Sequence, residues 1–168
     1  VATGDFNKDG LLDIAIGAPG TDAAGTDVGV VRIHHGVTGG FFDPQPAQVL
    51  TGRFGGDLFG WSLATCDFND DGFLDIAVGA YNAEDRDRTP VRSNQGGVLV
   101  YHGHDSGFPS AASRALWGDT PDGSGGWQGI ANMHHGVSLA AGDIDGDGVC
   151  DLAAGTHEYD LPGNTNTG

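Results

Sequence analysis

A nine-residue acidic pattern that occurs three times constrains the fold of this chain more than any other feature. The pattern is D-x-(N/D)-x-D-G-x-x-D, and its copies begin at Asp5, Asp67 and Asp143. Each copy is followed by a short apolar run, such as Ile14–Ala18 or Ile76–Ala80. A motif that returns at intervals of tens of residues is typical of repeat architectures, in which each repeat is one supersecondary unit. The chain is therefore expected to be built from repeated units, each holding one acidic loop.

Composition limits what these units can be. Gly accounts for 31 of the 168 residues, and no segment shows the helical spacing of apolar side chains, so short strands and turns are expected. No apolar run approaches the roughly 20 residues that a membrane-spanning helix needs. The formal net charge of −16 argues against a nucleic-acid partner. Ten of the 23 acidic residues lie at ligand positions of the three loops, so the acidity indicates metal binding.

Further landmarks recur between the loops and divide each repeat into four strands. Gly29–Gly36 matches Gly96–Gly103, and the second repeat predicts strands over about 60–65, 74–79, 97–102 and 113–117. Strands joined by short connections pair in antiparallel fashion. Four such strands per repeat, arranged radially, form a β-propeller blade. We therefore expect an all-β chain of about two and a half propeller blades.

The repeats place the blades at residues 1–58, 59–134 and 135–168. The first blade is expected to lack its first strand, or to receive it from elsewhere, and the third is expected to be incomplete. Two and a half blades cannot close a ring and would leave sheet edges exposed. The chain is therefore expected to be part of a larger propeller, or to be completed by other copies of itself.

The spacing of oxygen-bearing residues in the loops predicts three Ca²⁺ sites. A hard divalent cation takes six to eight oxygen ligands, which side chains at loop positions 1, 3, 5 and 9 and the main-chain carbonyl at position 7 can supply. Sets of oxygen ligands without His or Cys favour Ca²⁺ over zinc or copper. The predicted ligands are Asp5, Asn7, Asp9, Leu11 (carbonyl) and Asp13; Asp67, Asn69, Asp71, Phe73 (carbonyl) and Asp75; and Asp143, Asp145, Asp147, Val149 (carbonyl) and Asp151.

The EF-hand begins with the same pattern but does not fit. It requires a bidentate Glu at loop position 12 and a helix on each side. Position 12 is occupied here by Ile16, Val78 and Ala154, all within apolar strand sequence. The acidic loops are therefore expected to join two strands of a hairpin.

The residues around the loops resemble a known family. Phe59-Gly60 before the second loop, and Gly79-Ala80 or Gly17-Ala18-Pro19 after a loop, are similar to the FG-GAP repeat of the integrin α-subunit propeller. The resemblance covers nearly the whole chain. It implies a seven-bladed propeller with calcium in its hairpins, an extracellular or cell-surface location, and a partner bound on the face opposite the calcium. The third copy departs from the motif, with His135-Gly136 and Gly155-Thr156 in the corresponding places, and integrin function itself is not implied.

Two insertions in the second repeat are candidates for partner binding. They span 82–94 and 118–134, and antiparallel strand order places both on the face opposite the acidic loops. We expect a protein or glycan ligand there, because exposed Arg and Trp side chains are common anchors of interfaces. The candidate residues are Arg86, Arg88, Arg92 and Trp127.

Other residues leave alternatives open. Cys66 and Cys150 lie in successive repeats and could form a bridge between them or remain free buried thiols. The seven His residues recur at repeat positions, as expected for packing or hydrogen bonding. No nucleophile elbow or phosphate-binding loop is present, so an enzyme is not expected. The favoured function is an adhesion or recognition module; a subunit of an extracellular filament and a non-catalytic propeller of a secreted hydrolase or lyase are the alternatives.

Overall fold

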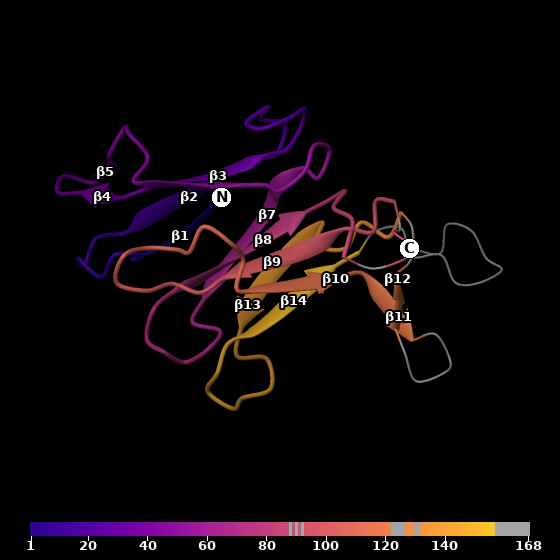
Figure 1. The fold of residues 1–168 in the computed structure, drawn as a ribbon. Coiled ribbons are helices and arrows are strands. Elements are labelled where there is room, and N and C mark those ends of the chain that lie inside the picture. The colour runs from indigo at the N-terminus through magenta and orange to yellow at the C-terminus, as the bar shows by residue number, and fades with distance from the viewer. Residues whose placement is uncertain (88, 90, 92, 122–126, 130–131, 157–168) are drawn as a thin grey trace.

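The computed structural model describes residues 1–87, 89, 91, 93–121, 127–129 and 132–156. Every regular element in these residues is a β-strand, which confirms the all-β prediction. Accordingly, the described part of the chain contains no helix that is long and apolar enough to cross a membrane. The described residues form five antiparallel sheets. The three sheets that carry the acidic loops follow one another along the chain, and Figure 1 shows them side by side.

The first sheet contains β1 (Ala2–Gly4), β2 (Asp13–Ala18), β3 (Val30–His34) and β6 (Gln48–Thr51), in the order β1-β2-β3-β6. The expectation that this blade lacks its first strand was wrong. The three residues of β1 form this strand. Their backbone pairs with β2, from Ala2 opposite Ala15 to Gly4 opposite Asp13. The first blade therefore has a short first strand of its own, at the edge of the sheet.

The second sheet contains β7 (Phe59–Cys66), β8 (Asp75–Ala80), β9 (Gly97–Tyr101) and β10 (Arg114–Trp117). These bounds agree with the four predicted strands to within a residue or so at each end. Neighbours in the chain pair in antiparallel fashion, in the order β10-β9-β8-β7. The sheet is thus a four-stranded propeller blade.

The third sheet, in the described residues, consists of β13 (Ser138–Gly142) and β14 (Asp151–Gly155). Two small hairpins were not predicted. One joins β4 (Gly36–Val37) to β5 (Phe41–Phe42), and the other joins β11 (Asp119–Pro121) to β12 (Trp127–Gly129). Two or three residues per strand are too few to show an alternating apolar pattern, so the sequence carries no signal for them.

Apolar side chains fill the space between successive sheets. The second sheet presents alternate residues to its two neighbours, as the two-residue period of a strand requires. One face packs on the first sheet and the other on the third. The two clusters are built mainly from Ala15, Val31, Ile33, Leu50, Phe59, Ile76, Val78 and Tyr101 between the first and second sheets, and from Ala77, Val98, Val100, Leu139 and Leu152 between the second and third.

The Phe-Gly and Gly-Ala motifs meet across the boundary between sheets. The carbonyl oxygen of Gly60 lies against the α-carbon of Gly17 in the previous sheet, so closely that a Cβ on Gly17 would clash with it. Gly136 lies in the same way against Gly79. Phe59, beside Gly60, is completely buried and packs edge-on against Tyr101, with ring centroids 6.1 Å apart. Each motif pair is therefore a contact between neighbouring blades.

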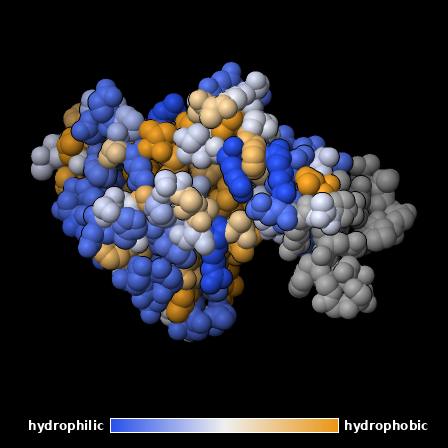
Figure 2. Space-filling model, viewed as in Figure 1, coloured by the Kyte–Doolittle hydropathy of each residue, from blue (hydrophilic) through white to orange (hydrophobic). Residues whose placement is uncertain are grey.

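Antiparallel order separates the two ends of the sheets. The acidic loops join β1 to β2, β7 to β8 and β13 to β14, whereas the insertions follow β8 and β10 at the other end. In Figure 1 the turn between β13 and β14 lies at the bottom, and β11 and β12 lie at the right. Figure 2, in the same view, shows mainly hydrophilic residues at the lower left, where the acidic loops gather. The face that carries the acidic loops is therefore distinct from the face that carries the insertions.

Candidate metal centres

The three acidic loops share one hydrogen-bonded conformation. In the first loop, the backbone N–H groups of Asp9 and Gly10 donate to the carboxylate of Asp5 at 3.1 and 2.9 Å. The bonds to Asp67 in the second loop measure 3.1 and 2.7 Å, and those to Asp143 in the third measure 3.1 and 3.0 Å. The first Asp thus organises each turn.

Backbone conformation explains the glycine of the pattern. Position 6 is left-handed in all three copies, with φ of 83° at Gly10, 85° at Gly72 and 91° at Gly148. Glycine adopts this conformation without the steric cost that a Cβ brings. Position 4 is left-handed as well, and the third loop places Gly146 there, with φ of 81°. The loop shape is therefore encoded locally.

Position 5 holds the second half of each loop. Its carboxylate accepts the N–H of position 7 at 2.8 Å in all three copies. In the first two loops the amide of the Asn at position 3 also donates to it, at 2.9 Å from Asn7 to Asp9 and from Asn69 to Asp71. These bonds favour the charged form, with the backbone bond contributing most, and they lower the pKa of both Asp9 and Asp71.

Position 9 anchors the loop to the sheet. Asp75 is completely buried, and its two oxygens accept the N–H groups of Phe68 and Gly103 at 2.9 and 2.8 Å. Asp13 is equally buried and accepts the N–H groups of Phe6 and Gly36, both at 2.8 Å. A carboxylate in such a position fixes the start of the loop and the end of the third strand at once.

A histidine completes the anchor in the second blade. His102 Nδ1 lies 3.0 Å from the carboxylate of Asp75, and it precedes Gly103, the other partner of that carboxylate. In the first blade His34, which corresponds to Tyr101 of the second blade, contacts the carbonyl of Asp43 through its Nδ1, at 2.8 Å. Both contacts agree with the expectation that the histidines serve hydrogen bonding.

The third loop brings three predicted carboxylate ligands together. Oxygens of Asp143, Asp145 and Asp151 all lie within 4.8 Å of one another, the one such group of acidic, His or Cys side chains among the described residues. In the first two loops position 3 is Asn, so its oxygen is an amide carbonyl. In all three loops the position-5 carboxylate faces the loop's own backbone. The donor sets are entirely oxygen, which fits a hard divalent cation and not a soft one.

The loops are also linked to one another. Lys8 of the first loop places its Nζ 3.4 Å from the centre of the Phe73 ring in the second, a cation–π contact. Cys66, directly before the second loop, forms a disulfide with Cys150 inside the third. The structure thus decides between the two alternatives for the cysteines. The three loops form one connected row along their face.

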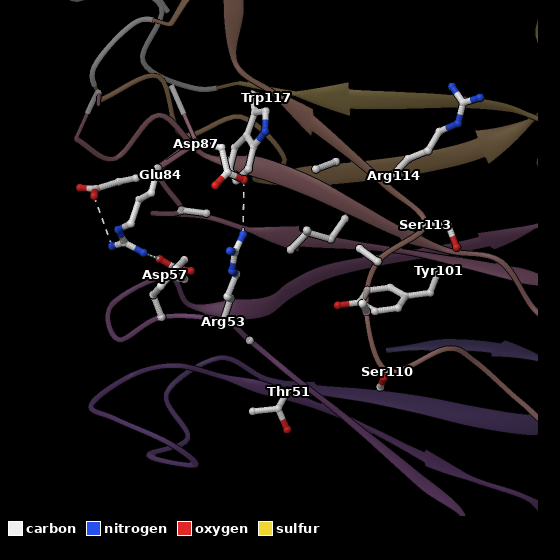
Figure 3. A pocket seen from close by; sticks show the side chains of 18 residues that line it. Thr51, Arg53, Asp57, Glu84, Asp87, Tyr101, Ser110, Ser113, Arg114 and Trp117 are labelled. Atoms are coloured by element: carbon white, nitrogen blue, oxygen red, sulfur yellow. Dashed lines mark hydrogen bonds and ion pairs between the residues drawn. The ribbon is translucent and has the colours of Figure 1, made fainter. Parts of the chain in front are cut away.

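A pocket of about 570 Å³ lies between the outer parts of the first and second sheets (Figure 3). Its lining includes Tyr101, whose burial raises its pKa to about 12. Arg86, which also lines the pocket, pairs with Asp57 at 3.4 Å and with Glu84 at 3.2 Å. Burial raises the pKa of Asp57, an effect that Arg86 partly offsets.

The candidate partner residues are described unevenly. Arg86 is held within the chain by the two ion pairs above, and its guanidinium lies 4.1 Å from the centre of the Phe54 ring. Arg88 and Arg92 lie outside the described residues. Trp127 belongs to strand β12, and nothing is described of its side chain. Of these four side chains the structure describes Arg86 alone, so the grouping of the four residues stays a prediction.

His135 occupies the place that Phe59 has in the previous repeat. Burial lowers its pKa, because the charged form of the ring is disfavoured there, and the carboxylate of Asp119 opposes this shift. Its backbone N–H donates to the carbonyl of Gln95 at 3.0 Å, as that of Phe59 donates to Val28 at 3.1 Å. The imidazole ring therefore replaces the aromatic ring without loss of the backbone contact.

Comparison of the sequence with known proteins identifies a family and several relatives that match most of this chain. The family model of the FG-GAP repeat matches residues 1–34, 59–101 and 135–168. Integrin alpha-5 of Xenopus laevis is 32% identical over 171 residues, which cover 95% of this chain and 14% of that protein. Integrin alpha-PS2 of Drosophila melanogaster is 33% identical over 163 residues, covering 96% of this chain and 10% of that protein.

A relative of another kind is also similar. Phosphatidylinositol-glycan-specific phospholipase D of Rattus norvegicus is 34% identical over 161 residues, which cover 90% of this chain and 17% of that protein. The chain therefore spans between 10% and 17% of the length of these three relatives. The similarity concerns the repeats, and it is shared by proteins with different names and activities.

Proposed function

Because the chain belongs to the FG-GAP repeat family, we propose that it is a calcium-stabilised β-propeller segment of a secreted or cell-surface protein that acts in adhesion or recognition. The observation that carries this proposal is the common geometry of the three acidic loops, each at the turn between the first two strands of its blade. Relatives named as integrin alpha subunits support the adhesion role.

The acidic loops would hold the metal through residues that already shape the turn. Side chains at positions 1, 3, 5 and 9 and the carbonyl at position 7 would bind it in each loop, as the sequence predicts. The cation would supply positive charge that offsets the repulsion between the carboxylates of one loop. The third loop has four Asp ligands instead of three, because Asp145 stands at position 3. The repulsion between its carboxylates is therefore the greatest of the three loops. Calcium would stabilise the hairpin and would not take part in a catalysed reaction.

The exposed face of the first sheet supports a larger ring. Ile16 is 37% exposed there, whereas Val78, its counterpart in the second sheet, is completely buried by the first sheet. Val49 of β6, which shares a row with Ile16 across β3, is 44% exposed on the same face. This face has the composition of one that a neighbouring blade covers. We take the occupant to be a further FG-GAP blade, as in a seven-bladed propeller.

Calcium content tests the proposal directly. The purified chain is expected to contain three Ca²⁺ per molecule, and EDTA is expected to lower Tm by about 10 °C, because a ligand that binds only the folded state stabilises it. Calcium, and not the same concentration of magnesium, should restore Tm. Replacing Asp67 with Ala is a control that should remove one ion. Metal content well below one ion per loop, with Tm unchanged in EDTA, would refute the calcium sites.

We propose that a partner binds on the face that carries the insertions at 82–94 and 118–134. Trp127→Ala and the triple variant Arg86→Ala/Arg88→Ala/Arg92→Ala are expected to weaken binding to a protein or glycan ligand about tenfold or more, as for anchors of an interface. Binding to a panel of extracellular-matrix proteins and immobilised glycans would measure this. The control is Lys8→Ala on the acidic-loop face, which should bind normally. Unchanged binding by both variants would place the partner elsewhere.

A second candidate function is favoured by the phospholipase D relatives. Their names describe enzymes, and this chain covers 17% of the rat protein. In that case the propeller would be a non-catalytic domain of a secreted hydrolase. A catalytic domain encoded in the same gene would decide for this alternative.

A further inference from the structure

We propose that the disulfide between Cys66 and Cys150 couples metal binding at the second and third acidic loops, so that these two sites fill cooperatively. The inference rests on the calcium sites proposed above and adds their regulation. Its basis is where the two cysteines lie relative to the ligands.

Each cysteine is adjacent in the chain to predicted ligands. Cys66 is the last residue of β7 and directly precedes Asp67, the first ligand of the second loop. Cys150 is position 8 of the third loop, between Val149, which would bind through its carbonyl, and Asp151. The α-carbons of the two cysteines are 6.1 Å apart, across 84 positions of sequence. One covalent link therefore joins the backbones of two metal loops.

The third loop is the most exposed of the three. Its position 2, Ile144, is 68% exposed, whereas Phe6 at the same position of the first loop is 5% exposed. Its position 9, Asp151, is half-buried, whereas Asp13 and Asp75 are completely buried. Within the described residues, the disulfide between Cys66 and Cys150 is the covalent link between this loop and the second one.

A shared covalent tie makes the two binding events interdependent. A metal ion that orders one loop also restricts the cysteine of that loop, and through it the backbone beside the ligands of the other. The second ion then meets a loop that has already lost part of its conformational freedom, which gives positive cooperativity. By thermodynamic linkage, an ion in the second loop raises the affinity of the third by the same factor as an ion in the third raises that of the second.

The first loop provides an internal control. The residue before it is Gly4 and its position 8 is Leu12, so no disulfide can form there. Its contacts with the second loop include the cation–π pair of Lys8 and Phe73 and the approach of Leu74 to Gly4. Neither contact is covalent. Its affinity for calcium should not depend on the disulfide.

The experiment follows each site separately in the whole chain. The amides of Gly10, Gly72 and Gly148 each bond to the first Asp of their own loop, so their NMR signals during a calcium titration report the three sites. Replacing both cysteines by Ser is expected to weaken binding at Gly72 and Gly148 about tenfold and to leave Gly10 unchanged. In the disulfide-bonded chain, Asp143→Ala is expected to weaken binding at Gly72 about tenfold as well.

The outcomes separate the two proposals. If none of the three glycine signals responds to calcium, the calcium sites themselves are wrong. If all three respond but Asp143→Ala leaves Gly72 unchanged in the disulfide-bonded chain, only the coupling is overturned. This comparison needs no cysteine variant, so it stands even if the double Ser variant does not fold. If Asp143→Ala affects Gly72 equally with and without the disulfide, the coupling runs through another contact and the proposal fails.

Discussion

Replacing Asp75 with Asn is expected to lower the free energy of unfolding by about 3 kcal/mol even in the absence of calcium, because buried groups would lose their acceptor. Asp75 is completely buried and accepts the N–H groups of Phe68 and Gly103, while His102 Nδ1 lies 3.0 Å away. The side chain of Asn keeps one acceptor oxygen, but its NH₂ group would face one of the two backbone N–H groups that Asp75 accepts from. The decrease in the free energy of unfolding would come from the weaker hydrogen bonds between loop and sheet. Any effect of losing the metal ion would add to it.

The matched control is Asp145→Asn in the third loop. It makes the same chemical change at an exposed position, and Asn is the residue that the other two loops carry there, as Asn7 and Asn69. We expect it to change stability by less than about 0.5 kcal/mol without metal. Urea unfolding in EDTA would measure both variants. Equal stability of the two variants would show that Asp75 acts only as a metal ligand.

Replacing Gly79 with Ala is expected to lower Tm by about 6–12 °C, equivalent to about 3 kcal/mol in a chain of this size. A Cβ at this position would lie closer than 3.0 Å to the carbonyl oxygen of Gly136 and to Oγ of Ser62. Ser62 donates to that same carbonyl at 2.6 Å. The backbone of the third sheet cannot withdraw without breaking this bond, so the methyl group would force the second and third blades apart.

Gly142→Ala is the control for this substitution. Gly142 also lies in a strand, β13, but a Cβ there would meet no atom within 4 Å. Its expected effect on Tm is neutral or slightly positive, since Ala restricts the unfolded chain. Gly17→Ala repeats the test at the first boundary, where the carbonyl of Gly60 takes the place of Gly136. If Gly79→Ala melted like Gly142→Ala, the Phe-Gly and Gly-Ala contact would not hold the blades together.

The sequence predicted the strands of the second blade well, because their signals are local. Runs such as Ile76–Ala80, bounded by Gly and by an acidic turn, show their type and length within a few residues. The first strand of the first blade was missed because Ala2–Gly4 has too few residues to show a period. The hairpin of β11 and β12 was missed for the same reason. Short elements depend on their neighbours for pairing.

For the candidate metal sites, too, the sequence predicted the local features and missed the contacts made by packing. The pattern of Asp, Asn and Gly predicted three loops with equivalent positions, and the structure shows equivalent hydrogen bonds in all three. That Asp13 and Asp75 are buried anchors between loop and sheet could not be predicted from the sequence pattern. Nor could the sequence show that Arg86, proposed for partner binding, is paired with Asp57 and Glu84.

By itself the sequence determined the repeat, the strand order within a blade and the shape of each acidic loop. These depend on residues close together in the chain, where turn geometry and side-chain period act directly. Only the tertiary structure decided which glycine meets which carbonyl between blades, and that Cys66 is bonded to Cys150. Such contacts join segments tens of residues apart, and their geometry is set by how neighbouring sheets pack. The three loops are therefore alike in sequence, and packing and one disulfide make them different.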